Sequence, residues 1–253
     1  MDDLGIVVPA YRPDVDRLES YLRSLLAAFD DPVVRVELDA PDAETLESVS
    51  ALDLPIELGA VPYRRGKGAA VTAGFEALDA DRLAFADADG STPAAELRRV
   101  TDALEDADVA AGSRRHPDAH VVGHQTVARR LLGDGFAWFA RRLLDAKLYD
   151  YQCGAKAITA PTWRAVREHL YEPGFAWDVE LLAVAAALGF SVAEVPIEWE
   201  DRPGSTVAPV RTSLSMARTL VVARHRAGKL QNSTLHSALS RTDSPTALVD
   251  RDR

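Results

Sequence analysis

The hydrophobic pattern of the chain switches repeatedly between two periods. Strand-like runs of about six residues, rich in valine and other apolar residues, occur at 5–10 (GIVVPA) and at 33–38 (VVRVEL). Between these runs, Leu18, Leu22 and Leu25 recur at helical spacing. A strand, a helix and a second strand in that order predict a βαβ unit and hence a parallel sheet.

The same alternation continues to about residue 114, and then the order of elements changes. The pattern predicts helices over 44–52, 69–78 and from Pro93 onward, and strands over 55–61, 83–86 and 108–114. Farther along it predicts a long helix over 127–148, a short strand over 155–159, two more helical runs and a strand over 191–199. We therefore expect an α/β fold with a mainly parallel central sheet flanked by helices.

Length and composition suggest one large domain with appendages. A chain of 253 residues, 47% of them hydrophobic, can bury a full core. We expect the α/β domain over 1–209, an amphipathic helix over 210–230 and a disordered tail over 231–253, where the sequence is polar and unpatterned.

Charge limits the partners of the chain. Lysine and arginine total 29 against 39 aspartates and glutamates, a net charge of −10, and no basic stripe is available to bind nucleic acid. The acidic, lysine-poor composition resembles that of proteins from salt-loving (halophilic) archaea. No apolar run approaches the roughly 18 residues of a spanning helix, and the N-terminus lacks the features of a signal peptide, so we expect a cytoplasmic protein that at most lies on a membrane.

Two carboxylates stand where an apolar strand gives way to a helix. In FADADGSTP, Asp87 and Asp89 follow the strand, while Thr92 and Pro93 form a predicted helix start with proline in the first helical position. The carboxyl edge of an open α/β sheet is where ligands bind. Two carboxylates there can hold a divalent cation and the phosphates that it bridges, although turn residues of this kind are often simply solvated.

Six sequence blocks together carry a resemblance. VVPAYRP, RRGKGAAVTAGFEAL, DADGSTP, GSR, DYQCGAKAIT and FAWDVELL with its continuation to GSTV occur in this order between residues 4 and 207. The order resembles that of family 2 glycosyltransferases, in particular the branch that makes dolichyl-phosphate glucose or mannose. The resemblance implies a GT-A fold, which is a Rossmann-like nucleotide-diphospho-sugar transferase fold, over 1–209. It also implies protein glycosylation by inverting, metal-dependent hexose transfer from a GDP- or UDP-sugar to a polyprenyl (dolichyl) phosphate.

The resemblance also assigns a donor site. It places the nucleotide-sugar against Pro9, Ala10, Tyr11, Asp39, Lys67 and Asp87. Asp87 and Asp89 would bind Mg²⁺ or Mn²⁺ against the diphosphate, since a departing nucleoside diphosphate gathers charge that a cation stabilises. Lys67 opens a glycine-started helix, a place suited to phosphate, although it could equally be a solvated lysine.

On the acceptor side, the resemblance selects two arginines, a loop and a further carboxylate. Arg114 and Arg130 would face the acceptor phosphate or the donor diphosphate, because a guanidinium can grip phosphate with two hydrogen bonds. Arg130 could instead belong to a solvated helix face. Asp150 and Gln152 would hold the acceptor loop, and Asp178 would orient the acceptor, act as a base or simply cap a helix.

Two other function classes fit parts of the pattern. DADGST also resembles the nucleophile loop of haloacid-dehalogenase phosphatases, in which Asp87 would attack phosphorus and Asp89 would act as general acid. Altered residues after the first two strands, such as Arg12 and Pro13, motivate a third interpretation, a non-catalytic sugar-nucleotide-binding module.

A lipid acceptor requires contact with a bilayer. On the predicted helix over 210–230, an apolar stripe lies beside a cationic one, a pattern typical of helices that lie in the membrane interface. The apolar stripe consists of Val210, Leu214, Ala217 and Val221. The cationic stripe consists of Arg211, Arg218, His225 and Lys229. We expect peripheral binding at the cytoplasmic face of the membrane, with a membrane protein as a further candidate partner. The alternative is that this helix packs on the core of the protein itself.

Overall fold

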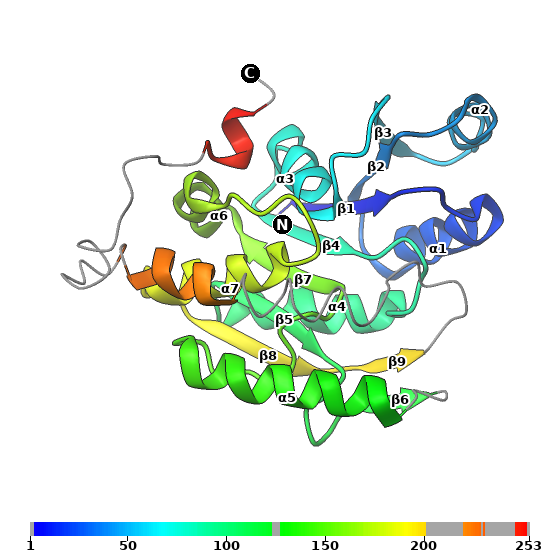
Figure 1. The fold of residues 1–253 in the computed structure, drawn as a ribbon. Helices are drawn as coiled ribbons and strands as arrows, with labels where there is room; N and C mark the ends of the chain where they lie inside the picture. The colour runs from blue at the N-terminus through cyan, green and yellow to red at the C-terminus, as the bar shows by residue number, and fades with distance from the viewer. Residues whose placement is uncertain (1–2, 123–126, 201–219, 229, 231–245, 252–253) are drawn as a thin grey trace.

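The computed structural model describes residues 3–122, 127–200, 220–228, 230 and 246–251 (Figure 1). Seven strands form the central sheet in the order β3-β2-β1-β4-β7-β5-β8. They are β1 (Leu4–Ala10), β2 (Val33–Asp39), β3 (Ile56–Val61), β4 (Arg82–Ala86), β5 (Val109–Ser113), β7 (Ala155–Thr159) and β8 (Val192–Pro196). Neighbouring strands are parallel except at β7, which runs antiparallel to both β4 and β5.

Helices flank this sheet. They are α1 (Val15–Ala28), α2 (Ala43–Ser50), α3 (Lys67–Ala77), α4 (Ala94–Asp102), α5 (Val127–Leu143), α6 (Ala160–Val166) and α7 (Trp177–Ala187). The described residues also form the 3₁₀ turns η1 (Ala103–Glu105), η2 (Arg167–His169) and η3 (Leu248–Asp250). The predicted α/β class with a mainly parallel sheet is confirmed.

The core has one hydrophobic cluster on each face of the sheet, and β1 shows why its sequence is continuously apolar. Ile6 and Val8 belong to the cluster under α1 and α4, whereas Val7 belongs to the cluster under α3, α6 and α7. Successive side chains of a strand point to opposite faces, so both sets are buried. The carboxyl ends of the parallel strands are thereby fixed at one edge.

The structure differs from the predicted elements at two places. The predicted strand over 191–199 is broken: β8 ends at Pro196 and pairs with β5, while β9 (Glu198–Glu200) pairs with β6 (His120–Val122) in a separate two-stranded sheet. Helix α4 begins one residue later than predicted, so Pro93 occupies the N-cap and not the first helical position.

The predicted C-terminal helix over 210–230 lies partly outside the described residues. Residues 220–228 are helical, and Leu220, Ala223 and Ala227 are buried there, while Val221 of the predicted apolar stripe is 56% exposed. Leu220 and Ala223 belong to the core cluster under α7. In its described part, therefore, this helix packs on the protein itself.

The expectation of a disordered tail over 231–253 is wrong for residues 246–251. Leu248 is buried, and its N–H donates a hydrogen bond to the carbonyl of Leu170 (2.8 Å). Arg251 donates to the carbonyl of Tyr171 (2.9 Å). One leucine, one valine and an arginine in an otherwise polar segment were a signal too short to separate from a tail. Within the described ranges of the chain, we find no helix of the length and apolarity needed to cross a bilayer.

Candidate active site

The predicted site residues converge on the edge of the sheet where the parallel strands end. Asp87 directly follows β4 and Arg114 directly follows β5. Because β7 is antiparallel, its start lies at the same edge, which brings the preceding loop 150–154 there as well. The Asp87 N–H donates to the carbonyl of Gly154 at 3.0 Å, so this loop is bound to the backbone of the segment that carries the two carboxylates.

A buried chain of alternating charges runs beneath Asp87. The Lys67 ammonium lies 2.9 Å from the Asp87 carboxylate and 3.2 Å from that of Asp178. The other Asp178 oxygen lies 3.0 Å from the Lys156 ammonium, and the side chains of Asp178 and Lys156 are only 2% and 1% exposed. Asp178 is thus held between two cations.

Helix α3 begins at Lys67, which fixes the position of the ammonium group. Gly66 precedes it with φ +97°, and a Cβ there would lie 2.5 Å from the carbonyl oxygen of Pro173, so both its conformation and its space require glycine. Burial opposes the charge on Lys67, but Asp178 and Asp87 outweigh it and raise the pKa of the ammonium. Lys67 is therefore a fixed cation at the edge of the site.

Asp178 does not cap its helix. The N-cap of α7 is Ala176, and Asp178 lies inside the helix with its side chain toward the two lysines. The capping alternative for Asp178 is therefore wrong: its carboxylate is bound between the ammonium groups of Lys67 and Lys156.

Asp87 and Asp89 form a donor set that fits a divalent cation. A Cβ on Gly154 would lie 1.8 Å from Asp87 Oδ2, so the absence of a side chain at residue 154 makes room for this carboxylate. Asp89 Oδ1 accepts the Ser91 N–H at 2.9 Å, which fixes the turn between the acids. The described residues contain no cluster of three or more acidic, histidine or cysteine ligands. This two-carboxylate arrangement suits Mg²⁺ or Mn²⁺ completed by substrate phosphates and water.

Burial and the neighbouring charge of Asp89 raise the pKa of Asp87, and the attraction of Lys67 opposes them. A cation bound between the two acids would relieve this repulsion, which agrees with the fit of the donor set.

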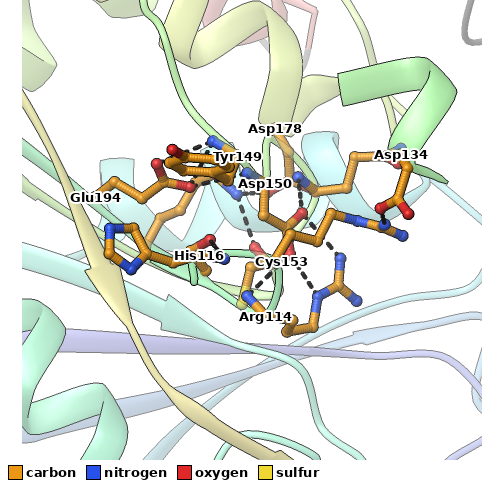
Figure 2. Close-up of polar contacts among 12 residues, drawn as sticks. Arg114, His116, Asp134, Tyr149, Asp150, Cys153, Asp178 and Glu194 are labelled. Carbon is orange, nitrogen blue, oxygen red and sulfur yellow. Dashed lines mark hydrogen bonds and ion pairs between the residues drawn. The ribbon is translucent and has the colours of Figure 1, made fainter. Parts of the chain in front are cut away.

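Arg114 is held by a fork of hydrogen bonds to Asp150 in the loop 150–154, which the resemblance assigned to the acceptor (Figure 2). Its Nε and Nη2 donate to the two carboxylate oxygens of Asp150 at 2.6 and 3.0 Å, and Asp150 also accepts the Gln152 N–H at 3.0 Å. Burial alone would raise the pKa of Asp150, but the charge and hydrogen bonds of Arg114 outweigh it and hold that pKa well below its usual range. The structure therefore brings Arg114, Asp150 and Gln152 together.

Glu194 of β8 supports this loop and was not predicted from the sequence. Its carboxylate accepts the N–H of Tyr149 at 2.8 and 2.9 Å and that of Asp150 at 2.8 Å (Figure 2). A single acidic residue in the apolar strand VAEVP is the signal that could have found it. Lys156 in AKAIT gave the same kind of signal.

Asp39 fixes the turn before α3. Its carboxylate accepts hydrogen bonds from Arg65 Nε and from the Gly66 N–H, both at 2.8 Å. Arg65 also binds Glu37 at 2.8 Å, and all three side chains are buried. The structure thus places Asp39 with residues 65–66, two partners that sequence reasoning did not assign to it.

Pro9 and Ala10 end β1 at the same edge, and Tyr11 follows them. The guanidinium of Arg64 stacks over the Tyr11 ring, 4.2 Å from its centroid. Arg130 belongs to α5, and its side chain lies outside the part of the structure that is described.

Comparison with known proteins identifies the family. The sequence profile described as glycosyl transferase family 2 matches residues 5–172. The chain belongs to glycosyl transferase family 2. It is therefore a glycosyltransferase, and the prediction from the six sequence blocks is confirmed, whereas the phosphatase interpretation and the non-catalytic one are wrong.

Several family members resemble the chain over most of its length. A dolichyl-phosphate beta-glucosyltransferase of Drosophila melanogaster is 30% identical over 246 residues, which cover 86% of this chain and 73% of that protein. That of Dictyostelium discoideum is 29% identical over 243 residues, with 88% and 74% covered. Glycosyltransferase AglD of Haloferax volcanii is 30% identical over 231 residues, 87% of this chain but 36% of the longer relative.

Solved structures share the fold. Glucosyl-3-phosphoglycerate synthase of Mycobacterium tuberculosis, in complex with Mn²⁺ and uridine diphosphate, superposes with a TM-score of 0.61 at 20% identity over 90% of this chain and 80% of that one. Mannosyl-3-phosphoglycerate synthase of Rubrobacter xylanophilus gives 0.64 at 16% identity, over 92% and 76%. The predicted GT-A fold is confirmed.

Proposed function

We propose that this family 2 glycosyltransferase moves a hexose from a nucleotide-sugar to the phosphate of a polyprenyl lipid of the dolichyl type, with inversion. The observation that carries the proposal is that two separate groups suited to phosphate share one edge. Lys67 lies with Asp87, Arg114 lies with the acceptor loop, and the Asp87–Gly154 hydrogen bond of 3.0 Å joins them. A reaction between a diphosphate donor and a phosphate acceptor needs both.

On the donor side, we assign the nucleotide to Pro9, Ala10 and Tyr11, with Asp39 as its base contact in the family pattern. Asp39 is already bound to Arg65 and Gly66, so it would act on the donor with this turn as one unit. The nucleotide is GDP or UDP in this proposal.

Asp87 and Asp89 would hold Mg²⁺ or Mn²⁺. When bound, that ion supplies charge stabilisation to the departing nucleoside diphosphate. Lys67 adds a fixed positive charge beside Asp87, and its anchor Asp178 keeps it there.

On the acceptor side, Arg114 orients the lipid phosphate, with Arg130 as a second cation. An oxygen of the phosphate forms the new bond to the anomeric carbon as the bond from that carbon to the diphosphate breaks. A phosphate monoester has a second pKa near 6 and is largely ionised at neutral pH, so its oxygen needs no strong base. This agrees with an Asp178 that is occupied by Lys67 and Lys156.

Because the proposed acceptor is a membrane lipid, we propose that the enzyme binds peripherally to a membrane. We assign it to the cytoplasmic face, where nucleotide-sugars are made. A membrane protein partner and a salt-rich cell, the latter motivated by the net charge of −10, belong to the same proposal.

The test is a panel of UDP- and GDP-hexoses with dolichyl phosphate, a short-chain polyprenyl phosphate and 3-phosphoglycerate as acceptors, with Mg²⁺ or Mn²⁺ at low and high salt. We expect one donor to give a glycosyl phosphate lipid in a metal-dependent reaction. Transfer to 3-phosphoglycerate alone, or donor hydrolysis alone, would overturn the proposed acceptor class.

A further inference from the structure

The outer face of α5 carries aromatic side chains where a surface helix is usually polar. Ala137 and Ala140 face the core, whereas Trp138 and Phe139 are 54% and 39% exposed. In an ordinary amphipathic helix the exposed face is charged or polar, because apolar surface is costly in water. Two large aromatic rings on one exposed face indicate that something other than water contacts it.

Arginines lie beside this aromatic surface. Helix α5, VARRLLGDGFAWFARRL, contains four arginines and one aspartate in a chain whose net charge is −10. The guanidinium of Arg142 lies 4.8 Å from the centroid of the Trp138 ring. That of Arg141 lies 4.8 Å from the centroid of Tyr149, which is also exposed. Amphipathic aromatic rings beside arginines suit the headgroup level of an anionic bilayer.

This surface adjoins the acceptor side of the site. Tyr149 directly precedes Asp150, the residue that holds Arg114. Arg115, next to Arg114, forms an ion pair with Asp134 of α5, and Figure 2 shows Asp134 and Tyr149 on either side of the Arg114–Asp150 pair. A bilayer resting on α5 would therefore present its headgroup phosphates beside Arg114.

We infer that Trp138, Phe139, Arg141, Arg142 and Tyr149, here called the α5 surface, dock the enzyme on anionic lipid headgroups. This inference rests on the proposed function and changes the expected place of membrane contact. In the described part of the helix predicted over 210–230, the buried residues include Leu220, Ala223 and Ala227, which leaves Val221 as its exposed apolar side chain.

The first test measures sedimentation of the full chain with vesicles of phosphatidylcholine and phosphatidylglycerol in equal amounts, and with phosphatidylcholine alone. We expect the parent to bind the anionic vesicles and the double variant Trp138→Ser, Phe139→Ser to bind them at least tenfold more weakly, because burial of aromatic rings in the interface is lost. Val221→Ser is the matched control, since it also removes an exposed apolar side chain, and should bind like the parent. Equal loss in both variants, or no loss in the double variant, would overturn the inference.

A second variant, Arg141→Gln with Arg142→Gln, keeps the rings and removes two charges. It should lose the preference for anionic over neutral vesicles, and an unchanged preference would refute the electrostatic part of the inference. A parent that binds neither vesicle and forms a dimer through Trp138 would identify a second copy as the occupant instead.

Activity separates this inference from the proposed function. The aromatic double variant should transfer hexose to a short soluble polyprenyl phosphate as fast as the parent but at least tenfold more slowly to dolichyl phosphate in anionic vesicles. If the parent uses neither acceptor, the proposed function fails, whatever the vesicle result. If the parent uses both and the double variant loses neither, the inference about α5 fails alone.

Discussion

The ammonium group of Lys67 lies 3.2 Å from the carboxylate of Asp178, although 111 residues separate them in the sequence. Asp178 also binds Lys156, so its removal would leave two buried ammonium groups without their shared partner. In this arrangement Asp178 positions Lys67.

We predict that Asp178→Asn destabilises the fold by about 3 kcal/mol, because it leaves buried charges uncompensated. We also expect it to lower the rate of hexose transfer. The pH–rate profile of the remaining activity should keep the shape of the parent profile. Loss of its acidic limb would show that Asp178 acts as the base. Urea unfolding and initial rates from about pH 5 to 9 measure both effects.

Asp89→Asn should abolish transfer while the fold survives. The change is nearly isosteric, and Asp89 Oδ1 can still accept the Ser91 N–H, but a charged ligand for the cation is lost. The matched control is Asp79→Asn at an exposed position after α3, which should behave like the parent. Activity of the parent in excess chelator would contradict a metal role for the pair.

Arg114→Lys should lower turnover far more than stability. Lysine keeps the charge but cannot form the two parallel hydrogen bonds that Arg114 makes with Asp150, so both the loop and the phosphate would lose their alignment. We expect at least a tenfold fall in kcat with a thermal midpoint within a few degrees of the parent's. Unchanged kinetics at saturating acceptor would show that Arg114 serves only the loop.

The pair of Arg114 and Asp150 also predicts an acid dependence of stability. The folded pKa of Asp150 lies below its unfolded value of about 3.9, so the folded state binds fewer protons there and the pair stabilises the fold above that pH. This stability is lost as the pH falls through the folded pKa. Asp150→Asn should lower the free energy of unfolding at pH 7 and flatten its dependence on pH below about 4. Parallel curves for the two proteins would contradict this assignment.

Cys153 should be inert in the folded protein. It is buried, and burial raises the pKa of its thiol to about 11, so on the order of one thiol in a thousand is ionised at pH 8. Iodoacetamide at pH 8 should leave the folded protein unmodified and should label the protein fully once urea has unfolded it. The mass of the intact protein measures both results. Rapid labelling of the native chain would show that the 150–154 loop opens.

The sequence predicted the parts of the site that lie close to a periodic pattern. Asp87, Asp89 and Lys67 each stand where a strand or helix boundary is readable in the sequence, and the structure adds the contact between Lys67 and Asp87. The apolar pattern of AKAIT predicted a strand, but it did not show whether that strand runs parallel or antiparallel to its neighbours. A short apolar run has the same pattern in either direction. The contacts of Asp178 with Lys156 and of Asp150 with Glu194 depend on long-range pairing of strands, which periodicity does not contain.

The helix predicted over 210–230 shows a different limit. A helical wheel offered a face with Val221, but the described residues bury the face with Leu220 and Ala223. Two neighbouring apolar stripes on one helix look alike on a wheel, and contact with the rest of the fold decides which one is buried.

Because β7 runs antiparallel to its neighbours, two different segments of the chain meet at one edge of the sheet. One carries Asp87 and Asp89, and the other is the loop that holds Arg114. Asp87 and Asp89 follow β4, where the chain leaves the sheet, while the loop that holds Arg114 precedes β7, where the chain enters it. We therefore expect that changes in residues 149–153 act on Arg114 and leave Asp87 and Asp89 in place, provided that residue 154 stays glycine beside the Asp87 carboxylate. If the proposed function holds, the fold thus lets the acceptor side change while the donor chemistry is inherited intact, and we expect an exchange of this short segment between relatives to alter acceptor use before donor use.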